Sequence, residues 1–157
     1  MLFRAASAMT NRDELLLVSR DFGDHFQVAN ADRWISATCP MSSAFLSAAT
    51  GGALAAWETA GQVYYTSINA KTGLVSPAIH PPGNTQRKHP VVVQNGKGDV
   101  LLVWTEGTGW EKGGSVAWQL FDRSGNPLSE RGQVDGVPVW SLATAGVRKD
   151  GSFVVIY

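Results

Sequence analysis

Residues 52–59 read GALAAWET, and residues 99–106 read DVLLVWTE. The tryptophans in these two segments, Trp57 and Trp104, stand 47 positions apart, and each segment follows a glycine-containing turn. A third segment, residues 152–157 (SFVVIY), also follows such a turn. Self-similarity at a period near 50 residues is typical of folds that repeat one structural unit. We therefore expect the chain to be built from consecutive copies of such a unit.

The apolar segments within each unit predict β-strands. They are short, rich in β-branched and aromatic residues, and interrupted by Gly, Asn, Asp or Pro, which is typical of an all-β protein. Several, such as residues 90–94 (PVVVQ) and 100–104 (VLLVW), have continuous apolar runs rather than an alternation of apolar and polar residues. Such strands are buried on both faces, so the sheets must pack on other sheets. Four short strands in a unit of this length predict a four-stranded antiparallel β-propeller blade.

The repeats divide the chain into one partial propeller domain, residues 1–157, of about three blades and thirteen strands. We name the strands of a blade a to d from the inside outward. Residues 1–36 then give strands b to d of an incomplete blade, residues 37–82 and 84–136 give complete blades, and residues 137–157 give only the inner strands of a last blade. Complete propellers usually have about four to eight blades, so this chain falls short of a ring.

Composition excludes several kinds of function. The 157 residues carry 13 Lys and Arg against 13 Asp and Glu, so we expect neither a nucleic acid nor a membrane surface as partner. A single cysteine excludes an internal disulfide and a Cys-rich zinc site, and we expect no metal and no other cofactor. No apolar run has the ~18–20 residues of a membrane span, and we expect no signal peptide, because the first residues lack an apolar stretch of the necessary length. The compartment is left open, with the cytoplasm as the default.

Residues 19–26 read SRDFGDHF and fit the Asp-box pattern Ser/Thr-x-Asp-x-Gly-x-Thr-Phe/Trp, from which only His25 departs. In such a turn the Asp21 carboxylate accepts backbone N–H groups, Gly23 permits a positive φ, and we expect Phe26 to pack into the blade. The motif positions are Ser19, Asp21, Gly23 and Phe26.

With this motif at the c–d turn of a repeated four-stranded unit, the chain resembles the sialidase-type propellers, also called the bacterial neuraminidase repeat or Asp-box superfamily. The resemblance corresponds to the C-terminal half of a six-bladed ring. It implies an exo-acting glycoside hydrolase for terminal acidic sugars of glycans. We expect this half to be inactive alone, because half of the usual site would lie on missing N-terminal blades. The alternative is a non-catalytic glycan-binding or scaffold module, which a second copy of the chain could complete as a homodimer.

The b–c and d–a connections of propeller blades reach one common face, where we expect the site. Sialidases bind the substrate carboxylate through arginines and use carboxyl side chains in glycosyl transfer, so the resemblance implies roles for residues of these connections. The catalytic candidates are Glu58, Glu106 and Asp13. The substrate-binding candidates are Arg12, Arg87, Lys88, His89 and Trp110.

Each candidate also has a purely structural interpretation, which the sequence leaves open. Glu58 and Glu106 occupy equivalent positions after the repeated tryptophan, so both could simply be hydrogen-bonded blade residues. Residues 87–89 could form a solvated basic loop, and Arg12 could pair with its neighbour Asp13. Trp110 lies in a glycine-rich loop beside an acidic residue, where an indole can stack on a sugar ring.

Overall fold

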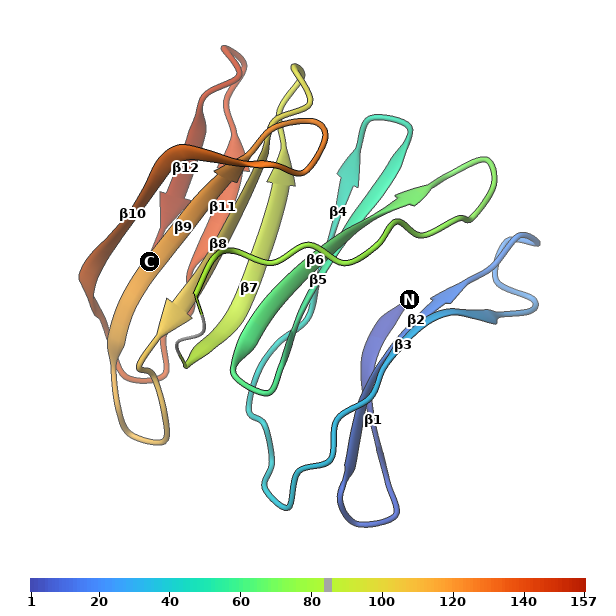
Figure 1. The fold of residues 1–157 in the computed structure, drawn as a ribbon, viewed down its shortest axis with the longest axis horizontal. Helices are drawn as coiled ribbons and strands as arrows, with labels where there is room; N and C mark the ends of the chain where they lie inside the picture. The colour runs from blue at the N-terminus through green and yellow to red at the C-terminus, as the bar shows by residue number, and fades with distance from the viewer. Residues whose placement is uncertain (84–85) are drawn as a thin grey trace.

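The computed structural model describes residues 1–83 and 86–157, which contain twelve β-strands in four antiparallel sheets (Figure 1). The first sheet consists of β1 (Leu2–Ser7), β2 (Asn11–Val18) and β3 (Gln27–Asp32), and the second of β4 (Phe45–Ala49), β5 (Gly52–Thr59) and β6 (Gln62–Asn69). The third consists of β7 (Arg87–Gln94), β8 (Val100–Glu106), β9 (Gly114–Phe121) and β10 (Pro127–Val137), and the fourth of β11 (Thr144–Val147) and β12 (Phe153–Ile156). No helix that could cross a membrane occurs among these residues.

The second sheet differs from the prediction because its fourth strand is not fully formed. Residues 75–79 pair with β6 only through two isolated bridges, Tyr65 to Ile79 and Ile68 to Val75. Pro77 lies between the bridging residues, and a proline has no N–H to donate to a neighbouring strand. The expected thirteenth strand is therefore an irregular edge segment. Residue 84, where the sequence places the start of the next blade, lies outside the described residues.

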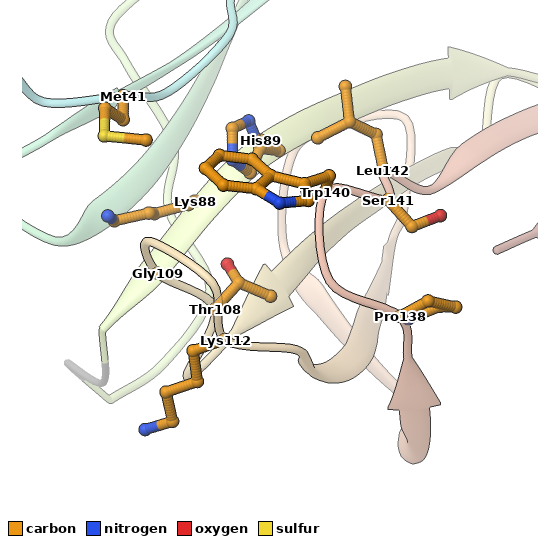
Figure 2. A pocket seen from close by; sticks show the side chains of 10 residues that line it. All are labelled: Met41, Lys88, His89, Thr108, Gly109, Lys112, Pro138, Trp140, Ser141 and Leu142. Atoms are coloured by element: carbon orange, nitrogen blue, oxygen red, sulfur yellow. The ribbon is translucent and has the colours of Figure 1, made fainter.

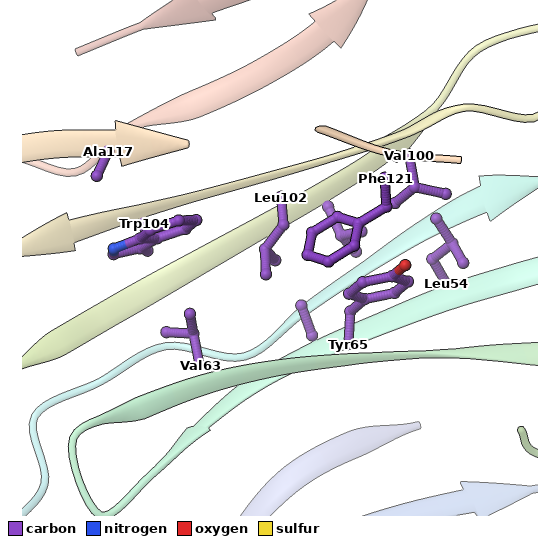
Figure 3. Close-up of a cluster of buried hydrophobic side chains, with 10 residues drawn as sticks. Leu54, Val63, Tyr65, Val100, Leu102, Trp104, Ala117 and Phe121 are labelled. Carbon is purple, nitrogen blue, oxygen red and sulfur yellow. The ribbon is translucent and has the colours of Figure 1, made fainter. Parts of the chain in front are cut away.

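The third sheet is buried on both faces, as its continuously apolar strands predict. One face joins Val92, Leu102 and Phe121 to residues of the second sheet, where the rings of Tyr65 and Phe121 meet edge to face at 5.1 Å (Figure 3). The opposite face packs on the fourth sheet. Its buried residues are Val91, Leu101, Val103, Val116, Val137 and Ala143. Alternate residues of the same strands thus supply two separate cores, which fixes the order of these three sheets.

The first sheet meets the second largely through polar contacts. The Asp32 carboxylate accepts hydrogen bonds from the Trp57 indole N–H at 2.6 Å and from the Thr59 hydroxyl at 2.7 Å. The Arg20 guanidinium donates to the carbonyl of Thr72. A hollow of about 870 Å³ lies between the two sheets, lined by Leu16, Phe26 and other residues. Directional hydrogen bonds therefore hold the position of the first sheet.

The turn after β2 has the local hydrogen bonds that its sequence predicts. Asp21 Oδ1 accepts the His25 backbone N–H at 2.9 Å, and the Ser19 hydroxyl accepts the Gly23 N–H at 2.8 Å. Gly23 has a φ of 102°. The expectation that Phe26 packs into the sheet is wrong, because its side chain is 43% exposed and borders the hollow beside the first sheet. The assignment of the turn at residues 19–26 as an Asp-box stays a prediction.

Figure 1 shows that the connections of the four sheets collect at two opposite ends. The turn at residues 19–26 and the turns after β4, β7, β9 and β11 lie at the upper end of the view. The lower end, which we call the loop face, collects the connections that follow β1, β3, β5, β8 and β10, together with residues 80–83 and 86 before β7. Binding residues commonly lie on loops held by a rigid scaffold.

Candidate functional site

The predicted site residues all lie at strand ends or in connections of the loop face. Arg12 and Asp13 begin β2, Glu58 is near the end of β5, and residues 87–89 begin β7. Glu106 ends β8, and Trp110 follows it in the connection to β9. Their surroundings differ greatly, however. One residue belongs to a buried charge cluster, others line or border a pocket, and the rest form two structural clamps, by which we mean side chains that hydrogen-bond to neighbouring segments of the chain.

The buried charge cluster consists of Arg4, Glu14 and Glu58. The Arg4 Nη2 atom lies 3.3 Å from Glu14 Oε2 and 4.0 Å from Glu58 Oε2, and each carboxyl side chain is only 2% exposed. Arg4 and Glu14 face each other across β1 and β2, and the guanidinium lies 5.1 Å from the centre of the Trp34 ring. Arg4 Nε and Glu14 Oε1 are buried without a hydrogen-bond partner among the described residues. One arginine thus serves two acids from different sheets.

Burial changes the proton affinity of both acids. It raises the pKa of Glu14 to about 7 against the opposing pull of Arg4, and the charges of Asp32 and Glu58 add to the increase. Burial also raises the pKa of Glu58, whereas the N–H of Gly61 and the charges of Arg4 and Lys88 favour its ionised form. The Gly61 N–H donates to Glu58 Oε1 at 2.7 Å. The cluster therefore contains a carboxyl group that can hold a proton near neutral pH.

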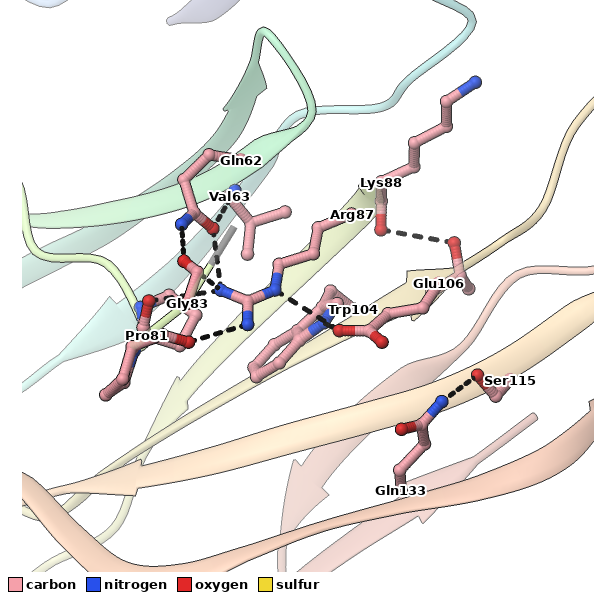
Figure 4. A network of polar contacts seen from close by, with 12 residues as sticks. Gln62, Val63, Pro81, Gly83, Arg87, Lys88, Trp104, Glu106, Ser115 and Gln133 are labelled. Atoms are coloured by element: carbon pink, nitrogen blue, oxygen red, sulfur yellow. Dashed lines mark hydrogen bonds and ion pairs between the residues drawn. The ribbon is translucent and has the colours of Figure 1, made fainter. Parts of the chain in front are cut away.

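Arg87 forms the first structural clamp, which Figure 4 shows. Its Nε donates to Glu106 Oε1 at 3.2 Å, and its Nη1 donates to Gln62 Oε1 at 2.9 Å. The same Nη1 also donates to the carbonyls of Pro81 at 3.1 Å and Gly83 at 3.3 Å, and Nη2 donates to the carbonyl of Pro82 at 2.7 Å. The guanidinium lies 5.0 Å from the ring centre of Trp104, whose indole N–H donates to the same Glu106 oxygen at 2.7 Å. These contacts engage Arg87 and Glu106 with the protein itself.

Arg12 and Asp13 form a second clamp, in which Arg12 holds the connection after β1 and Asp13 holds the connection after β3. The Arg12 guanidinium donates at 2.8 Å to the carbonyls of Met9 and Asn11. The Asp13 carboxylate accepts the backbone N–H of Trp34 at 3.1 Å, and the Arg12 N–H donates to the Trp34 carbonyl at 2.7 Å. Both side chains therefore secure local backbone. Their assignment to substrate binding and catalysis stays a prediction.

A pocket of about 160 Å³ opens on the loop face where four segments meet (Figure 2). The segments are the connection after β3, the start of β7, and the connections after β8 and β10. The lining residues are Met41, Lys88, His89, Thr108, Gly109, Lys112, Pro138, Trp140, Ser141 and Leu142. Lys88 also acts electrostatically on Glu58, so the pocket and the buried charge cluster are neighbours. The lining combines an indole, an imidazole and hydroxyl groups, the mixture that small polar ligands require.

The local backbone holds His89 firmly at this pocket. Its N–H donates to the Ser42 hydroxyl at 3.1 Å, and its Nδ1 accepts the backbone N–H of Ser43 at 3.2 Å. A ring nitrogen that accepts an N–H carries no proton, so the proton of the neutral ring is on Nε2. Burial, followed by the charge of Lys88, lowers the pKa of His89 and favours this neutral form.

Trp140 and Trp110 form an exposed aromatic pair at the pocket. Their rings meet edge to face, with centroids 4.6 Å apart and planes at 88°. Trp110 is 69% exposed and Trp140 is 59% exposed, whereas Trp57 and Trp104 are almost wholly buried. Large aromatic side chains left in water next to a pocket are typical of binding surfaces.

The structure thus brings together only part of the predicted set. Lys88 and His89 line the pocket, Trp110 stands beside it, and Glu58 is its neighbour through Lys88. Arg4, Glu14 and Trp140 were not predicted as site residues from the sequence. The register of β1 and β2 could have indicated Arg4 and Glu14, because it places them opposite each other. Leu16, the next residue on the same face as Glu14, is buried.

Comparisons with known proteins support the fold. Neither a protein-family model nor a curated protein matches the sequence. The structure is similar to that of the GH93 α-L-arabinofuranosidase of Fusarium graminearum in complex with arabinobiose, with a TM-score of 0.61 and 14% identity over 99% of this chain. It is also similar to that of the Penicillium chrysogenum α-L-arabinanase complexed with arabinobiose, with a TM-score of 0.57 and 16% identity over 96% of this chain.

This chain matches 52% and 50% of those two solved chains, so it spans about half of their length. It therefore has the fold of about half of a six-bladed glycosidase propeller, a sialidase-like fold. Because fold alone does not establish function, activity has to be argued from the site.

Proposed function

We propose that the loop face of this chain binds a glycan, in the manner of a glycosidase-type propeller. The observation that carries this proposal is the pocket between His89 and Trp140, whose lining residue Lys88 acts electrostatically on the buried carboxyl group of Glu58. A sugar offers hydroxyl groups for polar side chains and an apolar ring face for an indole. Both of the solved structures named above hold arabinobiose, which supports a neutral sugar as the ligand.

A terminal acidic sugar is the second candidate, and the presence of Lys88 and Lys112 in the pocket lining favours it. A carboxylate ligand is bound best by bidentate guanidinium groups, however. The guanidinium groups of Arg12 and Arg87 already donate to protein carbonyls, and that of Arg4 is shared between two glutamates. We therefore rank neutral sugars above acidic ones.

We expect Trp110→Ala to weaken glycan binding about tenfold, because the exposed indole offers an apolar face to a bound sugar ring. Titration calorimetry with arabinobiose and 3′-sialyllactose measures this effect. The matched control is Phe22→Ala, because Phe22 is also fully exposed but lies in the turn at the opposite end of the molecule. Failure of the wild-type chain to bind either sugar would contradict the proposed function.

Hydrolysis of a glycosidic bond needs one carboxyl group that holds a proton and one that is ionised. Glu14, with a pKa of about 7, suits the first role. Glu58 is the candidate for the second role, because the N–H of Gly61 and the charges of Arg4 and Lys88 favour its ionised form against the burial that raises its pKa. Both carboxyl side chains are 2% exposed in this chain, so a substrate cannot reach them as they stand.

We therefore expect the chain alone to bind sugar without turnover. Release of p-nitrophenol from its α-L-arabinofuranoside measures this, and a fluorogenic sialoside serves as the acidic counterpart. Turnover that Glu58→Gln abolishes would show instead that the buried pair is accessible and catalytic. Completion of the fold by a second copy of the chain also stays a prediction, which light scattering can test.

A further inference from the structure

The pocket on the loop face has an unusual concentration of residues with a positive φ. Eight described residues other than glycine have a positive φ, and three of them line this one pocket: Met41 at 47°, His89 at 52° and Trp140 at 64°. Such a backbone conformation is unfavourable for these side chains and persists only where the surrounding structure enforces it. His89 adopts it inside β7, where the pairing with β8 is irregular between Lys88 and Val91.

The result of this irregularity is a fixed donor. Ser42 and Ser43 hold the backbone N–H and the Nδ1 of His89, and neither serine lines the pocket. The opposite edge of the ring carries the Nε2–H, which has no hydrogen-bond partner among the described residues. His89 itself lines the pocket, so this edge is the one available to a ligand. A neutral imidazole held this way donates one hydrogen bond and carries no net charge that would favour an anion.

The lining also indicates the charge of the ligand. Figure 2 shows the indole of Trp140 next to His89 in the middle of the view, whereas the amino groups of Lys88 and Lys112 point toward its edge. The part of the lining formed by Trp140 and His89 therefore offers an aromatic face and a neutral donor, and the lysine amino groups point away from it. The pocket has a volume of about 160 Å³ and opens to the surface of the loop face, which suits the binding of one small ring.

We propose that this pocket is a subsite for a single uncharged sugar ring, in which Trp140 packs on the ring and the Nε2–H of His89 donates to a ring hydroxyl. This inference rests on the proposed glycan binding of a neutral sugar and adds to it the place of the subsite and the two residues that bind the ring. His89 acts as a specificity-determining residue here, because a hydroxyl oxygen accepts its hydrogen bond and a buried, unpaired donor would be costly.

The test uses the whole chain and two probes, arabinobiose as the neutral sugar and 3′-sialyllactose as the acidic one, in titration calorimetry. His89→Gln retains an N–H donor at a similar reach, whereas His89→Met has a similar size but no donor. We expect H89M to weaken arabinobiose binding about tenfold and H89Q to stay within about threefold of the wild type. Trp140→Ala is expected to weaken it about tenfold as well, with Phe22→Ala again as the control.

Each outcome has a defined meaning. Arabinobiose binding that neither H89M nor W140A changes would overturn the inference while leaving glycan binding elsewhere on the loop face intact. A preference for 3′-sialyllactose that Lys88→Met abolishes would overturn the uncharged class of ligand. Absence of binding by both probes would overturn the proposed function together with the inference. Thermal unfolding shows whether each variant is folded. If W140A does not fold, the comparison of H89M with H89Q still tests the inference.

Discussion

Replacing Arg87 with methionine is expected to lower the free energy of unfolding by about 3–5 kcal/mol. The substitution removes the guanidinium that engages the side chains of Gln62 and Glu106 and three backbone carbonyls. It also leaves the Glu106 carboxylate, whose side chain is 16% exposed, without its cation. Removing one partner of a buried ion pair costs more than the pair contributed, because the remaining charge stays desolvated.

Urea unfolding of the variant measures this loss. Arg131→Met is the control, because Arg131 is an exposed arginine on β10 of the same sheet and should change the stability by less than about 0.5 kcal/mol. Arg87→Lys retains the charge but not the planar fork, and should fall between the two. Wild-type stability of R87M combined with loss of glycan binding would instead support the anion-binding role that the sequence predicts.

Glu14 is expected to make the protein less stable as the pH rises from about 4.5 to about 7. Burial raises the pKa of this carboxyl group from 4.5 to about 7 in the folded chain. Between these two pH values the unfolded chain loses the proton while the folded chain keeps it. The contribution of Glu14 to the free energy of unfolding is therefore fully present below about pH 4.5 and is lost as the pH rises to about 7. The full span corresponds to about 3 kcal/mol.

Glu14→Gln should remove most of this slope, since an amide does not titrate. The stability of the variant and of the wild type, compared from pH 4 to pH 8, gives the contribution of this group alone. The control is Glu130→Gln on an exposed position of β10, where we expect the curve to follow the wild type. Parallel curves for E14Q and the wild type would show that Glu14 titrates normally, and would remove the reason to consider it a proton donor.

The fold could be predicted because it depends on local, repeated patterns. The glycine turns before β5 and β8 and the apolar strands after them define the repeat, and continuous apolar runs such as residues 100–104 predicted that sheets would cover both faces. The irregular strand at residues 75–79 was missed, although Pro77 carries the signal, since a proline cannot complete a strand ladder. Phe26 was misplaced because the hollow beside the first sheet cannot be inferred from its motif.

The candidate site was only partly predictable. The connections of the loop face could be identified from the blade pattern, and Lys88, His89 and Trp110 follow from it. The partners of Arg87 could not, because carbonyls from residues 81–83 reach it through a connection whose path no local pattern specifies. The tautomer of His89 depends in the same way on Ser43, which is distant in sequence.

Glycan binding on the loop face can be tested by NMR, by following the indole N–H signals of the chain during titration with arabinobiose. The six tryptophans give six indole signals. We predict that the signals of the exposed pair, Trp110 and Trp140, shift with increasing sugar, while those of the buried Trp57 and Trp104 stay in place. Single Trp→Phe variants assign each signal. Six unmoved signals at millimolar arabinobiose, or shifts confined to the buried tryptophans, would contradict the assignment of the ligand to this face.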